Sequence, residues 1–313
     1  MQYLITITDY EMIPVQVATP NRSSNHKQRR FDFQEEWEAD NDNSNKENRC
    51  VESHLNSYAA KVQKKMIAAL LEKYDYFGAW ELAKTIRPSL SNKAFDLITA
   101  AKDRYMLDGE KAKAVFKRCG IKGTDIKKPA FEYLLRLELL VRKGEYSDFI
   151  RGLTPLLGQL YMLVLDTQCG INVKKYVSRG KWDYNKVKAN ARLFDALNSE
   201  SGDFTKLYYN NSNVLVTLIK SLVENRDIVS MCEKLRLVEE RVRTDTAHEM
   251  VYVSSETIAE KTTDKDIAPD GLPPKNIISI ILKVFSSCGI CTEKELLSEY
   301  DRMNGIIRGA VNT

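Results

Sequence analysis

The 313-residue chain is poor in the residues from which most metal and redox centres are built. It has three histidines, His26, His54 and His248, and six scattered cysteines. Three histidines are too few for a histidine-rich metal centre. Cysteines spread over such a length do not make the disulfide framework of a small secreted domain. We therefore expect reduced thiols and a cytoplasmic protein.

Long apolar runs are also missing. The stretches LLGQLYMLVL and NIISIIL are shorter than the roughly 18 residues that span a bilayer. The amino-terminal MQYLITITDYEM has no basic region and carries acidic residues early, so it does not have the pattern of a secretory signal. We expect no membrane association.

Glycine-rich phosphate loops are absent, which excludes nucleotide hydrolysis and dinucleotide redox chemistry as leading functions. Charge of one sign is not in large excess, since 47 Lys and Arg against 43 Asp and Glu give a formal net charge of +4. This balance allows visits to RNA but is far from that of a constitutive nucleic-acid binder. The chain also lacks a repeat of fixed period, which argues against a regular solenoid.

Most of the chain has helical periodicity, so the predicted fold class is mainly α. Apolar residues recur at steps of three and four, as at Val62, Met66, Ala69 and Leu70, the pattern of an amphipathic helix. A loop is expected over 262–275, where Pro and Gly gather. The expected helices cover 58–86, 91–107, 110–119, 128–143, 146–168, 184–198, 204–224, 228–250, 275–287 and 293–308.

The first part of the chain differs in composition. Residues 2–8 and 13–18 are short, apolar and β-branched, which predicts two strands. Two strands do not form a stable domain alone, so they must join a sheet from elsewhere or lie on the helices. The next stretch is rich in Asn, Asp, Glu, Lys and Ser, as polar linkers are. The predicted division is strands over 1–20, a linker over 21–53, a helical middle domain over 54–145 and a helical C-terminal domain over 146–313.

Two short motifs suggest chemistry that their surroundings do not support. CGIC at 288–291 has redox spacing, but a working CxxC usually sits at a helix N-terminus after a strand, and here a helical segment precedes it. A turn between two helices is the better interpretation, with a thiol-redox protein using Cys288 and Cys291 as the third-ranked alternative. HEMVY opens like a zinc-protease signature but has Tyr252 in place of the second histidine, so that metal site fails.

Arg243 and His248 are the best candidates for catalysis. They stand five places apart in VEERVRTDTAHEMVYVSS. A histidine titrates near about pH 6.5, so it can accept and donate a proton at neutral pH. The planar fork of an arginine grips a phosphate and stabilises the charge that develops on it. Together they suit metal-free RNA cleavage, in which the 2′-hydroxyl of the substrate attacks the adjacent phosphate and leaves a cyclic phosphate end.

Spacing alone is weak evidence, because Arg49 and His54 have the same R-x4-H spacing. On a continuous α-helix five residues turn about 500°, which leaves the two side chains about 140° apart. Arg243 and His248 converge only if the helix starts or bends between them, or if two chains contribute to one site. Thr and Asp cap helices readily, so TDT at 244–246 is a candidate break.

The surroundings of this motif resemble those of the HEPN ribonuclease superfamily. The R-x4-H pair ends an all-helical region, preceded by LVEERV and followed by EMVYVS. At the other end of the chain, DYEMIPVQVATPNRSSN is similar to the last strand of a CARF domain, in which QVATP leads into the linker. The order of segments resembles that of the CARF–HEPN ancillary ribonucleases of type III-A CRISPR systems, the Csm series. The resemblance rests on residues 12–22 and 238–254.

The resemblance implies a role for each motif residue. Arg243 would bind phosphate and stabilise charge, and His248 would be the general acid or base. It further implies a homodimer whose two motifs form one composite site, single-stranded RNA as the substrate, and no cofactor or metal. Cyclic oligoadenylate would be the activator, and the protein would act beside a type III CRISPR complex.

Two departures from the family pattern stand out. Thr244 replaces the asparagine that usually follows the arginine, which keeps a hydroxyl but loses an amide. The Rossmann-like CARF domain is represented only by the two strands of 1–20, so the sensor is expected to be mostly missing. The chain is then a ribonuclease that cleaves weakly or without control, an inactive member of the family, or a protein whose sensor comes from another chain.

The main alternative is an interaction protein, a helical scaffold in which Arg243 and His248 have no catalytic role. A scaffold predicts that the two residues lie on a flat exposed face. A nuclease predicts that they lie in a basic cleft at a two-fold axis. We rank the three hypotheses nuclease, scaffold, redox protein.

Overall fold

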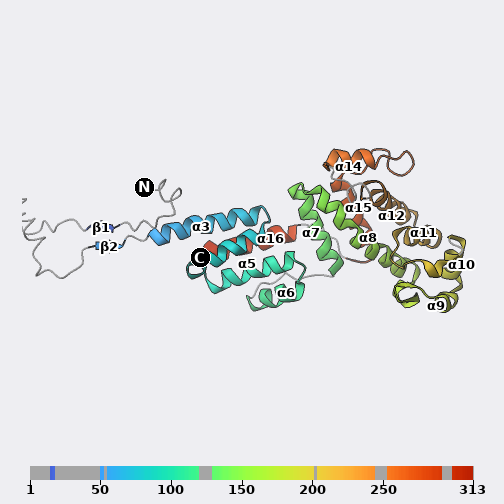
Figure 1. Ribbon diagram of the computed structural model, residues 1–313, viewed down its shortest axis with the longest axis horizontal. Helices are drawn as coiled ribbons and strands as arrows, with labels where there is room; N and C mark the ends of the chain where they lie inside the picture. The colour runs from blue at the N-terminus through green and yellow to red at the C-terminus, as the bar shows by residue number, and fades with distance from the viewer. Residues whose placement is uncertain are drawn as a thin grey trace, which may run out of the picture.

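The computed structural model describes residues 15–17, 50–52, 55–119, 129–200, 203–243, 252–290 and 298–312. The helices form two groups that follow one another along the long axis of the molecule (Figure 1). The N-terminal bundle consists of α3 (Leu55–Glu72), α4 (Tyr76–Thr85), α5 (Asn92–Tyr105), α6 (Gly109–Arg118) and the last helix, α16 (Glu299–Asn312). The C-terminal bundle consists of α7 (Pro129–Lys143), α8 (Tyr146–Cys169), α9 (Tyr184–Lys188), α10 (Ala191–Glu200), α11 (Ser212–Leu222), α12 (Arg226–Val238), α14 (Ser255–Lys261) and α15 (Pro274–Ser287).

The mainly α fold class is confirmed, although several predicted helices are divided. The predicted helix over 58–86 is broken at Tyr74, which has a φ of 55°. The next helix, α4, begins after Asp75, whose side chain caps it by accepting a hydrogen bond from the backbone N–H of Gly78. The predicted helix over 184–198 is likewise two helices, α9 and α10. Short 3-10 turns fill further joints at η2 (Arg87–Ser89), η3 (Val173–Tyr176) and η4 (Phe204–Lys206).

Strands are few in the part of the chain that the structure describes. β1 (Val15–Val17), which lies in the predicted strand over 13–18, pairs antiparallel with β2 (Cys50–Glu52). The polar composition around β2 concealed that strand, and the predicted strand over 2–8 lies outside the described residues. A second hairpin, β3 (Val177–Ser178) with β4 (Lys181–Trp182), was not predicted at all. None of the described helices is long and apolar enough to cross a membrane.

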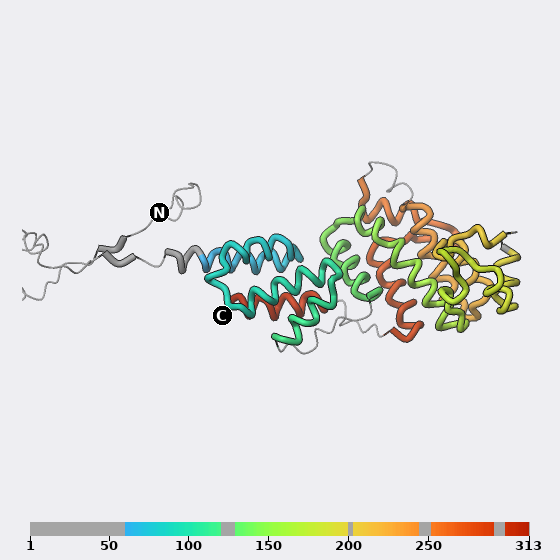
Figure 2. Tube along the Cα trace, turned by 60° about the horizontal axis from the view of Figure 1, so that its bottom comes forward, coloured from blue at the N-terminus to red at the C-terminus, as the bar shows by residue number. Residues whose placement is uncertain are grey.

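The last helix packs into the first bundle rather than beside its neighbours in sequence. Figures 1 and 2 show α16, in red, beside α3 and α5. The side-chain amide of Asn304 donates to the carbonyl of Leu71 at 2.7 Å and accepts from the hydroxyl of Tyr76 at 2.9 Å. Since both partners are buried, these bonds specify the position of α16. The N-terminal bundle is thus completed by the C-terminal end of the chain.

A buried ion pair joins the two bundles. Arg104 of α5, which is 1% exposed, forms two hydrogen bonds with the carboxylate of Glu132 of α7, at 2.9 and 2.7 Å. Its Nη1 lies 3.9 Å from Glu299 of α16, and its guanidinium lies 5.0 Å from the ring centroid of Tyr300. Burial alone would lower the pKa of Arg104, but the hydrogen bonds and charge of Glu132 outweigh it, so the pKa is raised and the guanidinium stays charged. One side chain therefore holds three helices together.

A half-exposed network covers the same junction. Arg142 of α7 donates to Glu138 at 2.5 Å, to the hydroxyl of Tyr74 at 2.8 Å and to Asp301 of α16 at 2.8 Å. Tyr74 in turn donates to Asp301 at 2.5 Å. Because the left-handed Tyr74 at the α3–α4 break contributes the hydroxyl, that break also serves the contact between bundles.

The predicted loop over 262–275 is confirmed and is tightly folded. The hydroxyl of Thr262, which is fully buried, donates to the carbonyl of Ile258 at 2.7 Å and accepts from the N–H of Leu272 at 2.7 Å. Gly271 has a φ of 71°, and a Cβ at this position would lie 2.1 Å from the carbonyl oxygen of Ala259. Backbone therefore occupies the space that any side chain would need.

We expect Gly271→Ala to lower the free energy of unfolding by about 3 kcal/mol, because left-handed strain adds to a clash with backbone. Gly144 is the matched control, since it has a φ of 73° and no atom lies within 4 Å of where its Cβ would stand. Gly144→Ala should cost about 1 kcal/mol, the conformational part alone. Urea unfolding followed by circular dichroism measures both, and equal losses would contradict the clash.

Candidate functional site

Arg243 lies at the end of a helix whose sequence explains where it stops. The side chain of Asn225 caps α12 by accepting from the N–H groups of Asp227 and Ile228. Apolar residues then bury one face of the helix as far as Val238. The next five residues, Glu239–Arg243, form a π-helical turn called η5. Turns of this kind are rare in proteins, and those that occur are often found at functional sites.

The π-helical turn is held by two buried residues of its own. Val242 is 2% exposed and Glu239 is 5% exposed. The Glu239 carboxylate accepts from Nη1 of Arg236 at 3.2 Å, and Nε of Arg236 donates to the side chain of Asn213 at 2.7 Å. A buried carboxylate needs such a partner. The end of α12 is thereby tied to the start of α11.

Arg241 ties the same turn to the loop that follows α14. Its guanidinium donates to the carbonyl of Thr263 at 2.8 Å and to Asp264 at 2.5 Å. Backbone N–H groups of Ile267 and Asp266 hold the pKa of Asp264 below its usual range, so this carboxylate is charged and available to the arginine. Neither Arg236 nor Arg241 was predicted from the sequence to support the candidate site.

Arg243 differs from Arg236 and Arg241. Its side chain is exposed, and it forms no hydrogen bond or ion pair with the residues that the structure describes. An exposed guanidinium is the kind of group that binds a phosphate through its planar fork. His248 and the candidate break at 244–246 lie outside the described residues, so their positions stay predictions. Tyr252, where the described chain resumes, is 86% exposed.

The predicted helix over 228–250 is wrong in one respect that matters for the motif. Regular α-helix ends at Val238, and Arg243 belongs to the π-helical turn. The separation of about 140° assumed a continuous α-helix. Residues 244–248, which lead from Arg243 to His248, lie outside the described residues, so the angle between the two side chains stays a prediction.

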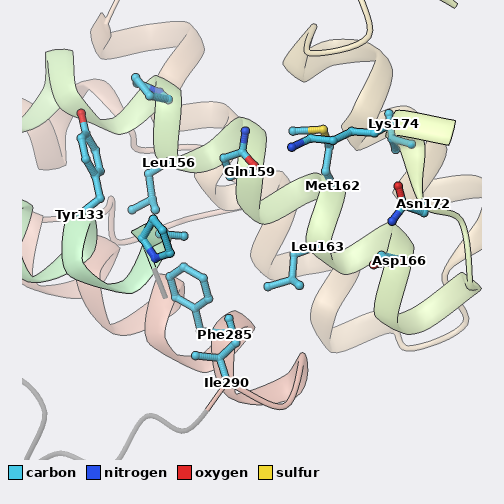
Figure 3. A pocket seen from close by; sticks show the side chains of 14 residues that line it. Tyr133, Leu156, Gln159, Met162, Leu163, Asp166, Asn172, Lys174, Phe285 and Ile290 are labelled. Atoms are coloured by element: carbon cyan, nitrogen blue, oxygen red, sulfur yellow. The ribbon is translucent and has the colours of Figure 1, made fainter. Parts of the chain in front are cut away.

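A separate groove of about 610 Å³ lies between α7, α8 and α15. Figure 3 shows Tyr133, Leu156, Phe285 and Ile290 toward one end of the groove. The other end is polar, with Lys174, Asn172 and Asp166. The α8 residues that line it form one stripe, whereas Tyr161 on another face of α8 reaches the carbonyl of Cys232 in α12 at 3.5 Å. The groove is thus on a different side of α8 from the helix that leads to Arg243.

The CxxC motif begins where the thiol is not activated. Cys288 is the C-cap residue of α15, at the negative end of the helix dipole, and Cys291 lies outside the described residues. Burial raises the pKa of the Cys288 thiol, and the hydrogen bond with Thr167 lowers it by less. Redox thiols need the opposite shift.

We therefore expect Cys288 to stay protonated at pH 7 and to alkylate slowly, with a rate that rises only above the ordinary pKa of a thiol. Peptide-resolved mass spectrometry after timed iodoacetamide treatment measures the rate. The same protein in urea is the control, because its thiols are exposed. Faster alkylation in the folded protein than in urea at pH 7 would restore the redox hypothesis.

Among the described residues, no group of three His, Cys, Asp or Glu side chains is placed to hold a metal ion. What the described site offers is an exposed arginine on a rigid turn within a helical bundle. The architecture is that of a mainly α protein with a HEPN-type helical domain.

Family models agree with this class. The model of the Csm6 HEPN domain matches residues 119–308, and that of the 6H domain of CRISPR-associated protein Csm6 matches residues 50–105. The first match alone covers more than half of the chain. The chain belongs to the Csm6 family.

Individual relatives are similar over nearly the whole chain. The CRISPR system endoribonuclease Csm6 of Mycobacterium tuberculosis is 26% identical over 299 residues, which is 93% of this chain and 66% of the relative. The structure of Enterococcus italicus Csm6 bound to cyclic hexa-2′-fluoro-hexa-dAMP superposes with a TM-score of 0.63 at 13% identity, covering 95% of this chain and 67% of that one. The chain therefore spans about two thirds of the length of these proteins, and the structural likeness shows the fold.

Proposed function

We propose that this chain is an endoribonuclease of CRISPR antiviral defence that cleaves single-stranded RNA without a metal ion. The observation that supports it most is Arg243, an exposed arginine without a partner among the described residues, at the start of an R-x4-H motif in the Csm6 HEPN domain. The M. tuberculosis relative carries the name endoribonuclease, which supports the same activity.

The chemistry would use groups of the RNA and of the protein only. The 2′-hydroxyl oxygen attacks the adjacent phosphorus and loses its proton to a base, and the 5′-oxygen leaves with a proton from an acid. His248 would serve in one of these transfers. Arg243 would hold the non-bridging oxygens and stabilise their charge as it builds up. The products are a 2′,3′-cyclic phosphate end and a 5′-hydroxyl end.

In the proposed active form, two chains pair and each contributes Arg243 and His248 to one composite site. A composite site needs no convergence of the two residues within a single chain. Sedimentation velocity of the purified protein tests the pairing. A monomer that cleaves RNA at full rate would contradict it.

Cleavage of a fluorogenic single-stranded RNA in EDTA tests the activity, with cyclic tetra-adenylate, cyclic hexa-adenylate or no activator. The cyclic hexanucleotide analogue bound to E. italicus Csm6 is the reason for including the larger ring. Cleavage in EDTA that leaves cyclic phosphate ends supports the proposal, and activation by either ring identifies cyclic oligoadenylate as the regulator. Silence under every condition would favour a helical scaffold that binds partners in the cytoplasm.

A further inference from the structure

Positive charge gathers on one short stretch of the C-terminal bundle. Residues 173–190 contain six basic residues and one acidic residue, a net charge of +5 against +4 for the whole chain. All six are exposed, and none forms an ion pair with a carboxylate in the described part of the chain. These six residues, which we call the basic hairpin surface, are Lys174, Lys175, Arg179, Lys181, Lys186 and Lys188.

The stretch has a fixed shape. Arg179 and Gly180 connect β3 to β4 with φ values of 50° and 80°, the two positive angles of a tight hairpin turn. Trp182 of β4 is 2% exposed, so the hairpin is anchored in the core. The ammonium of Lys186 donates to the carbonyl of Val177 at 2.8 Å, which holds that cation against the hairpin. Charges on a rigid element need little ordering when they bind.

Two exposed tyrosines lie among these cations. Tyr208, which is 62% exposed, forms a β-bridge with Lys181, whose ammonium lies 5.5 Å from the tyrosine ring centroid. Tyr184, which is 47% exposed, stacks on Phe204 with ring centroids 6.1 Å apart and has the ammonium of Lys188 at 5.8 Å. Single-stranded nucleic acids bind surfaces on which exposed aromatic rings lie beside cations, since the phosphates interact with the charges and the bases stack on the rings.

The basic hairpin surface is connected to the region of Arg243. Tyr208 lies just before α11, whose Asn213 accepts the hydrogen bond from Arg236 near the end of α12. Arg236 also holds Glu239, the first residue of the π-helical turn that ends at Arg243. Successive contacts thus lead from the hairpin to the candidate site within one bundle.

We propose that the basic hairpin surface, with Tyr184 and Tyr208, is a second contact for single-stranded RNA, outside the site of cleavage. RNA as the ligand rests on the proposed function, whereas the surface rests on its own charges and rings. Binding here would raise the local concentration of substrate at Arg243 without reading its sequence, because phosphates and ring faces are common to all nucleotides.

Binding of a fluorescent 2′-O-methyl RNA of about 12 nucleotides to the full chain tests this, since a strand without a free 2′-hydroxyl cannot be cleaved by the proposed chemistry. The double variant Arg179→Ala/Lys181→Ala should lower the slope of log Kd against log salt by about 1.4, which is about 25-fold in Kd at about 0.1 M salt. Tyr208→Ala should weaken binding about tenfold. All three positions are exposed, so the variants should fold, and circular dichroism checks this.

Matched controls remove the same groups elsewhere. Lys113→Ala/Lys117→Ala takes two exposed lysines from α6, and Phe77→Ala takes a ring that is 59% exposed on α4. These variants should bind within about twofold of the unchanged chain. Hairpin variants that bind like the controls would overturn the inference. A second result would also overturn it: Arg179→Ala/Lys181→Ala weakens binding, Tyr208→Ala has no effect, and heparin competes as well as RNA does. Such a surface would bind any polyanion and would not be specific for single-stranded RNA.

The two proposals fail separately. If the protein cuts no RNA but binds it through the hairpin, the RNA-binding surface is supported and the nuclease proposal is contradicted. If cleavage depends on His248 but the hairpin variants bind RNA normally, the nuclease proposal is supported and the RNA-binding surface is contradicted.

Discussion

Replacing His248 with alanine is expected to slow RNA cleavage by about two to four orders of magnitude, because proton transfer by a positioned histidine contributes that much. Arg243→Ala should lower the rate by about two to three orders, the typical cost of removing a group that stabilises a developing oxyanion. Initial rates on a fluorogenic RNA in EDTA measure both. Arg243→Lys should recover only part of the loss, since a point charge replaces a planar fork.

The chain contains a matched control for this test. Arg49 and His54 repeat the R-x4-H spacing outside the HEPN domain, so Arg49→Ala/His54→Ala changes the same residue types at the same separation. This variant should cleave at the rate of the unchanged protein. A loss in Arg49→Ala/His54→Ala as large as that in His248→Ala would contradict the assignment of catalysis to the HEPN motif. Activity retained in His248→Ala would remove the histidine from the mechanism.

Replacing Arg104 with methionine is expected to lower the free energy of unfolding by about 3–5 kcal/mol. Methionine keeps the unbranched apolar start of the side chain but removes the guanidinium that faces the buried Glu132 carboxylate, which is 4% exposed. Because Arg104 of α5 bonds Glu132 of α7, which belongs to the other bundle, the bundles should separate earlier as well. Urea unfolding by circular dichroism measures stability, and limited proteolysis reports loosening between the bundles.

The double variant Arg104→Met/Glu132→Leu distinguishes the loss of attraction within the pair from the cost of a buried carboxylate that has lost its arginine. It should lie close to the unchanged chain or above it in stability, since well-packed apolar groups often replace a buried pair without loss. Lys84→Met is the surface control, because its ion pair with Glu81 is about half exposed and should contribute at most about 1 kcal/mol. If the double variant is as unstable as Arg104→Met alone, the pair itself stabilises the junction.

What can be predicted from the sequence follows from local chemistry. Three- and four-residue spacing of apolar groups indicates helices such as α5 and α15, because burial of one face suffices to select them. The same reasoning predicted one helix where there are two, α3 and α4. Tyr74 is left-handed at the break, and its hydroxyl contacts Arg142 of α7 and Asp301 of α16, which are distant in sequence. The reasoning missed β3 and β4 because two-residue strands carry almost no alternation, and because the turn between them is Arg179–Gly180 and lacks the Asn-Gly or Asp-Gly pair that signals a hairpin.

The candidate site divides in the same way. Residue types and spacing made Arg243 and His248 candidates, because phosphate binding and proton transfer depend on chemical groups that the sequence names directly. Arg49 and His54 have the same spacing, so the choice between the pairs came from the resemblance of residues 238–254 to the HEPN superfamily, and the role of the chosen pair stays a prediction. Tertiary structure decided that Arg236 and Arg241 are engaged with Asn213, Glu239 and the α14 loop while Arg243 has no partner among the described residues. Which cation is paired depends on residues that are distant in sequence, and only folding brings them together.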